Sequence, residues 1–224
     1  MKLDIWPVNI IPSMNLIRRP FRYRNDNVVF ILIGLNLLVY LVELFFKSFP
    51  VIPYLSMIPV AVIRGGWIWQ FVTYMFVHDP RSISHLLFNM FALFIFGNQV
   101  ERHMGSREFL LYYFVSGILA GIFSFLAYLF TGYFWVTLMG ASGAIFAVQL
   151  AFAVFFPNSV VYLWGILPLR APVMVLGFTA LEIILMITGL GGNVAHTTHL
   201  AGFGFGWLYF VVRFGINPWR AMRR

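Results

Sequence analysis

The sequence contains no cysteine and few charged residues. Without cysteine the chain has no disulfide, no thiolate nucleophile and no thiolate metal ligand, and its redox compartment cannot be inferred. Only 10% of the 224 residues are charged and 61% are hydrophobic, whereas soluble domains average roughly 25% and 45–50%. The mean hydropathy of +0.88 points the same way. These values exclude an ordinary soluble domain and predict a one-domain integral membrane protein.

Six apolar runs are long enough to cross a bilayer as helices, since a span needs about 17–25 residues. They predict an all-α, polytopic six-helix bundle. A further apolar stretch, Val51–Val77, is broken by prolines and by Arg64–Gly66, so we predict a membrane-embedded loop or re-entrant hairpin there. The six predicted helices are Val28–Phe46, Ile83–Val100, Phe109–Phe130, Leu138–Phe156, Ala171–Gly189 and Val194–Val212.

The basic residues predict how the bundle is oriented. If both termini are cytoplasmic, 12 of the 15 Lys and Arg fall on the inner side, and only Lys47, Arg64 and Arg81 fall outside. The positive-inside rule therefore supports an even number of spans. We expect a basic cytoplasmic segment (1–27), a six-helix catalytic domain (28–214) and a basic cytoplasmic tail (215–224). The net charge of +8 is then an orientation signal, which argues against nucleic acid as a partner. The short N-terminal segment fits a minimal bacterial or archaeal protein in the cytoplasmic membrane.

Four polar residues are expected at one depth near the outer surface. In this orientation three helices begin on the outer side, and their first turns carry His85 and Asn89, Ser142, and His199. Polar residues inside a membrane bundle are functional candidates. A serine becomes a nucleophile when a neutral histidine takes its proton. Asn and His side chains, together with backbone N–H groups at a helix start, can stabilise the resulting oxyanion.

The spacing in the last helix favours His199 over His196 as that base. At about 100° per residue, His199 shares a stripe with Gly202 and Gly206, while His196 lies about 60° from His199. Gly202 and Gly206 form a GxxxG motif, which allows close helix packing in membranes. We expect this stripe to meet Gly143 and Ala147, so that His199 reaches Ser142. His196 is then expected in a wetter position near the mouth.

These motifs resemble the rhomboid family of intramembrane serine proteases. The resemblance rests on "HLLFN" (His85, Asn89), "GASG" (Gly140–Gly143), "VERHMGSREF" and "HLAGFGFG" (His199, Gly202, Gly206), in order on the expected helices, and it covers about Val28 to Phe214. It implies a Ser142–His199 dyad without an acid partner, cleaving membrane-protein helices near their outer ends. It also implies an oxyanion hole from His85, Asn89 and the Ser142 amide, and an aromatic contact of Phe146 with the catalytic imidazole. Gln70 stands where the family commonly has Arg, and Phe146 where it often has Tyr.

Other interpretations compete with this one. Taken alone, the serine, the His–Asn pair and the glycines are each explained by helix packing. A metal or haem protein using His85, His196 and His199 lacks a ligand motif, and a transporter lacks internal repeats. The main alternative is an inactive rhomboid-like protein that binds other membrane proteins, although this chain retains both Ser142 and His199. We expect membrane-protein substrates and no metal or cofactor; the sequence does not specify an oligomeric state. Glu182 and Gln149 receive no definite role.

Overall fold

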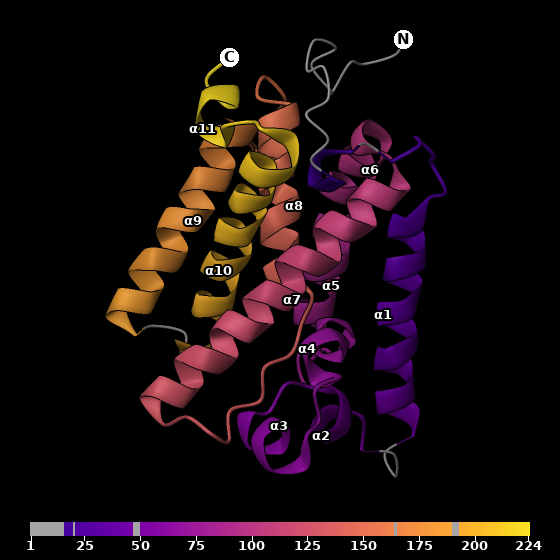
Figure 1. Cartoon of the computed structure of the whole chain (residues 1–224), viewed down its shortest axis with the longest axis vertical. Coiled ribbons are helices and arrows are strands. Elements are labelled where there is room, and N and C mark those ends of the chain that lie inside the picture. Colours follow the sequence, from indigo (N-terminus) through magenta and orange to yellow (C-terminus); the bar gives the residue numbers. More distant parts are fainter. Residues whose placement is uncertain (1–15, 20, 47–49, 164, 190–192) are drawn as a thin grey trace.

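Helices make up most of the chain in the computed structural model, which describes residues 16–19, 21–46, 50–163, 165–189 and 193–224 (Figure 1). The long helices are α1 (Val28–Phe45), α5 (Ile83–Ala92) continued by η3 (Leu93–Gly97) and α6 (Asn98–Met104), α7 (Ser106–Thr131), α8 (Ser142–Phe155), α9 (Ala171–Thr188), and α10 (Asn193–Tyr209) continued by η4 (Phe210–Phe214). The short ones are η1 (Leu16–Arg18), α2 (Val51–Leu55), α3 (Pro59–Gly65), α4 (Gln70–Thr73), η2 (Tyr74–Phe76) and α11 (Pro218–Ala221).

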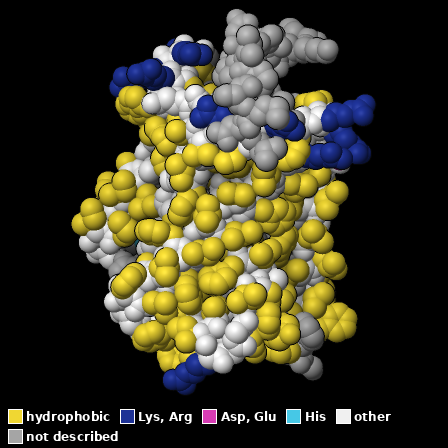
Figure 2. Space-filling model, viewed as in Figure 1, with side chains coloured by type: hydrophobic (Ala, Val, Ile, Leu, Met, Phe, Trp, Pro, Cys, Tyr) yellow, Lys and Arg dark blue, Asp and Glu magenta, His cyan; other side chains and the backbone are white. Residues whose placement is uncertain are grey.

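The outer surface of the bundle is apolar. Within the part of the chain that the structure describes, four helical stretches are long and apolar enough to cross a membrane: Val28–Phe45, Ile83–Met104, Ser106–Thr131 and Ala171–Thr188. In Figure 2 a broad hydrophobic belt covers the visible face, while Lys and Arg side chains gather mainly at the upper end. Exposed side chains such as Phe130, Trp135 and Ile187 suit a lipid environment. The prediction of a mostly helical, polytopic membrane protein is confirmed.

The direction of the long helices determines which residues meet at one end. α1, α7 and α9 run from the upper to the lower end in Figure 1, whereas α5, α8 and α10 run upward. The start of α1 and the C-terminal α11 therefore lie at the same end, as an even number of passes requires. The first turns of α5, α8 and α10 all face the lower half of the bundle.

The central helix α8 packs tightly against α10 through small residues. A Cβ atom built on Gly202 of α10 would collide with the backbone carbonyl of Gly143 in α8. One built on Gly206 would lie 2.8 Å from the Cβ of Ala147 and 2.6 Å from the hydroxyl of Tyr112. The structure thus places the glycine stripe of α10 against the small residues of α8, at a separation that only glycine allows.

α8 begins four residues later than the sequence predicted. Leu138 is not helical, because it exchanges two backbone hydrogen bonds of 2.9 Å with Met57 and so forms a β-bridge to the loop before α3. Gly140 follows with φ of +115°, a conformation that favours glycine and interrupts a helix. The expected helix from Leu138 was therefore wrong at its start, and Ser142 is the first residue of α8.

Two further features differ from, or add to, the expected architecture. A small antiparallel hairpin, β1 (Val160–Leu163) and β2 (Leu167–Arg170), joins α8 to α9, so the chain is not purely α-helical.

Within the loop of residues 51–77, short helices replace a full span, and buried Gln70 holds them together. Its Oε1 accepts the N–H of Ile58 at 3.0 Å, and its Nε2 donates to the carbonyl of Pro53 at 3.0 Å. An arginine could not accept the Ile58 proton.

Candidate active site

Ser142 lies at a helix start that glycine makes possible. The N–H of Gly140 donates to the carbonyl of Tyr74 at 2.9 Å, which fixes the turn into α8. A Cβ on Gly140 would approach the Nε2 atom of His85 to 2.9 Å. The first regular hydrogen bond of α8 runs from the N–H of Ile145 to Ala141. The amides from Ser142 to Ala144 therefore precede the helical hydrogen-bond ladder and can serve a ligand.

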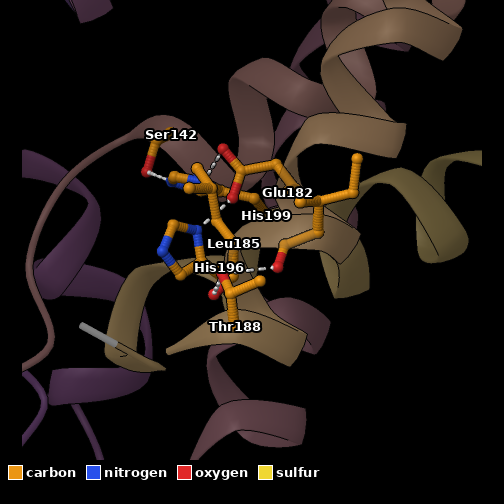
Figure 3. Close-up of polar contacts among 7 residues, drawn as sticks. Ser142, Glu182, Leu185, Thr188, His196 and His199 are labelled. Carbon is orange, nitrogen blue, oxygen red and sulfur yellow. Dashed lines mark hydrogen bonds and ion pairs between the residues drawn. The ribbon is translucent and has the colours of Figure 1, made fainter. Parts of the chain in front are cut away.

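His199 comes from α10 and meets the serine directly. Its Nε2 lies 2.7 Å from the Oγ of Ser142, which is hydrogen-bond distance. Phe146, one turn after Ser142, stacks on the imidazole with ring centroids 4.6 Å apart and an interplanar angle of 8°. The ring is thus held by its stacking partner on one face, and Figure 3 shows its contact with the Ser142 hydroxyl.

His85 and Asn89 line the same cavity as Ser142 and His199. This cavity has a volume of about 350 Å³ and also includes Gly140 in its wall. The Nδ2 of Asn89 donates one proton to the carbonyl of His85 at 2.8 Å, which leaves its second N–H available. The ring centroids of His85 and His78 lie 5.0 Å apart, and His78 is fully buried. Burial lowers the pKa of His78 to about 3, so this neighbour is neutral at physiological pH.

A larger apolar cleft adjoins the cavity. It has a volume of about 710 Å³ and lies between α5, the β1–β2 hairpin and α9. Phe88, Ala92 and Gln149 line both spaces, so the cleft and the Ser142 cavity share part of their walls. Gln149 is buried, and its Oε1 has no hydrogen-bond partner among the described residues.

The surroundings of Glu182 were not predicted from the sequence. This carboxylate of α9 lies with Oε2 2.5 Å from the Nδ1 of His196 and with Oε1 3.1 Å from the Nδ1 of His199 (Figure 3). His196 is buried, with 7% of its surface exposed, so its expected position at a wet mouth was wrong. The signal was available, because His196 and His199 are one turn apart and Glu182 is the only acidic residue after Glu108.

These three residues could also be considered as metal ligands, since their donor atoms lie within 4.8 Å of one another. However, the Glu182 Oε2 and His196 Nδ1 atoms are only 2.5 Å apart. Ligands of a tetrahedral ion at 2.0–2.1 Å would be separated by about 3.3 Å. Nε2 of His199 is also engaged with Ser142. The arrangement is a hydrogen-bonded cluster rather than a cation site.

Comparison with known proteins identifies the family. The model of the Rhomboid domain matches residues 65–216, which include every residue of the site described above. The chain belongs to the rhomboid family. Together with the apolar helices, this membership makes it an integral membrane protein.

Several proteins named as rhomboid proteases are similar to the chain. The putative rhomboid protease YdcA of Bacillus subtilis is 35% identical over 102 residues, covering 45% of this chain and 48% of the relative. The rhomboid protease GlpG of Haemophilus influenzae is 32% identical over 102 residues, covering 45% and 51%. The rhomboid protease AarA of Providencia stuartii is 30% identical over 155 residues, covering 62% and 53%. The chain thus spans about half the length of these curated rhomboids.

Proposed function

We propose that the chain is an intramembrane serine endopeptidase that uses Ser142 as nucleophile and His199 as general base. The observation that carries this proposal is the 2.7 Å contact between His199 Nε2 and Ser142 Oγ, made inside a bundle of apolar helices. A half-buried Ser–His pair adds only modest hydrogen bonding to the stability of a membrane bundle. The similarity to proteins named as rhomboid proteases supports the same function.

The reaction follows from the positions of the side chains. Ser142 Oγ attacks the substrate carbonyl carbon while its proton passes to His199 Nε2. The oxyanion receives hydrogen bonds from the backbone N–H of Ser142, the free N–H of Asn89 and the ring of His85. The C–N bond then breaks as His199 returns the proton to the leaving amine. Water, deprotonated by His199, hydrolyses the acyl-enzyme and releases Ser142.

The cleft between α5 and α9 supports membrane proteins as substrates. Its lining is mostly apolar, and it shares Phe88, Ala92 and Gln149 with the wall of the Ser142 cavity. A single-span or polytopic substrate would enter from the lipid and unwind locally, because a peptide bond inside a helix is shielded. Residues 28–214 form the catalytic domain in this proposal, flanked by basic segments 1–27 and 215–224. Both termini are cytoplasmic, in a prokaryotic cytoplasmic membrane, so cleavage occurs near the outer face.

Cleavage of a model single-span substrate tests the proposal. The substrate carries Ala at the scission site and is reconstituted in liposomes with wild type, Ser142→Ala or His199→Ala. We expect cleavage by wild type alone, unchanged by EDTA, since no metal takes part. Cleavage that survives Ser142→Ala would overturn the serine mechanism, and loss of activity in EDTA would favour a metal. A folded wild type that cleaves no substrate and is not labelled by a fluorophosphonate would favour an inactive, membrane-protein-binding rhomboid.

A further inference from the structure

Glu182 is an acidic residue in a part of α9 that packs loosely. The buried residues of this helix are Ala171, Met174 and Val175, all in its first two turns. Beyond them most side chains are half-buried or exposed, as on a lipid-facing helix. The side chain of Glu182 is nevertheless only 14% exposed, because it turns inward toward α10. A carboxylate at this depth is costly unless it has polar partners.

Its partners are two imidazoles one helical turn apart. One carboxylate oxygen lies 2.5 Å from His196 Nδ1 and the other lies 3.1 Å from His199 Nδ1. The first contact is a hydrogen bond, and the second is an ion-pair contact that is not aligned as a hydrogen bond. Figure 3 shows the Glu182 carboxylate next to both rings, on the side of His199 away from Ser142. Each oxygen is thus assigned to one histidine.

We infer that Glu182 is a positioning residue for His199, so that this rhomboid holds a Ser142–His199–Glu182 arrangement; the inference rests on the proposed function. The acceptor beside Nδ1 favours the tautomer with a proton on that nitrogen, which leaves Nε2 free to accept the proton of Ser142. When the proton moves from Ser142 Oγ to Nε2, the imidazolium faces the carboxylate. Glu182 remains ionised throughout and transfers no proton.

His196 holds the carboxylate in place. α9 makes few buried contacts near Glu182, so helix packing alone does not fix the acid. The 2.5 Å hydrogen bond from the buried ring of His196 supplies that restraint. Phe146 on one face and Glu182 at Nδ1 together fix the plane and the tautomer of His199. The resemblance to the family implied a dyad without an acid, so the acid is a feature of this chain's own residues.

The test compares Glu182→Gln and Glu182→Asp with Thr179→Val as a matched control. Thr179 lies one turn before Glu182 on α9, and its hydroxyl donates to the backbone carbonyl of Val175 in the same helix at 2.9 Å. We expect Glu182→Gln to lower kcat about 10- to 100-fold with little change in KM, less than the ~10⁴-fold cost of disturbing a fully buried triad aspartate. Glu182→Asp keeps the charge and should recover part of that loss, while Thr179→Val should resemble wild type.

Two readouts separate positioning from a merely structural role. The rate at which a fluorophosphonate labels Ser142 should fall in parallel with kcat, and the ¹⁵N shift of His199 Nδ1 should move toward the other tautomer. If Glu182→Gln is folded and both kcat and the ¹⁵N shift match wild type, the inference is overturned. A variant with lower thermal stability but unchanged kcat would also overturn it. Failure of the proposed function looks different, because Ser142→Ala would then cleave as wild type does.

Discussion

At the scale of single residues, the site depends on Gly140 as much as on the reacting groups. Its φ of +115° turns the chain into α8, and its missing Cβ leaves room for His85 Nε2. The backbone conformation alone disfavours any other residue. The contact with His85 adds a second requirement, which links the shape of the turn to the position of a proposed oxyanion donor.

We therefore expect Gly140→Ala to lower kcat/KM at least tenfold by displacing His85, beyond the ~1 kcal/mol backbone strain that alanine brings at positive φ. Gly132→Ala is the matched control, since Gly132 also has positive φ (+77°) but open space around it. It should lose stability to a similar extent and keep its activity. Peptidase assays and thermal unfolding of both variants in one detergent make the comparison. Equal activity in the two variants would contradict the role of His85.

At the scale of helices, the α8–α10 contact brings His199 to Ser142. Gly202 of α10 lies against the backbone carbonyl of Gly143 in α8. Gly202 comes three residues after His199, and Gly143 comes directly after Ser142. Backbone meets backbone there, so neither helix can yield by rotating a side chain. The distance between His199 and Ser142 is consequently set by how closely the two helices approach.

Gly202→Ala should destabilise the bundle by about 1–3 kcal/mol through overpacking and should separate His199 from Ser142. Gly204→Ala is the matched control, because a Cβ at Gly204 meets nothing within 4 Å. The control should be neutral or slightly stabilising, since alanine favours a helix. Thermal melts and fluorophosphonate labelling distinguish the two variants. Wild-type behaviour of Gly202→Ala would contradict the close approach.

The helices themselves were predictable from apolar runs, and the spacing of His199, Gly202 and Gly206 indicated which face of the last helix is in contact. The sequence did not reveal where α8 begins, because the bridge between Leu138 and Met57 joins segments far apart in the chain. It also did not reveal the hairpin of β1 and β2, whose strands have only four residues each. The contact of Glu182 with two histidines depends on the relative rotation of α9 and α10, so the sequence offered these three residues as candidates but did not specify that they meet.

At the scale of the whole molecule, the absence of cysteine allows the proposed orientation to be tested directly. Arg64 and Arg224 are both exposed, and the proposal puts them on opposite sides of the membrane. In intact cells a membrane-impermeant thiol reagent should label Arg64→Cys and spare Arg224→Cys, which should react only after lysis. Each variant carries one thiol, and wild type carries none. The reverse pattern would place the active site on the cytoplasmic side.

The length of α8 has a consequence for substrate choice. Its 14 residues span about 21 Å, whereas the hydrocarbon core is about 30 Å thick. With an upright α8 whose other end lies at the inner edge of the core, Ser142 would lie roughly 9 Å below the outer edge, a depth that about three extended residues can bridge. The scissile bond of a substrate would have to reach that depth, and the substrate residues that lead to it would have to give up their helical hydrogen bonds. Under the proposed function, substrates would be selected more by how readily a few of their residues unwind than by their amino-acid sequence.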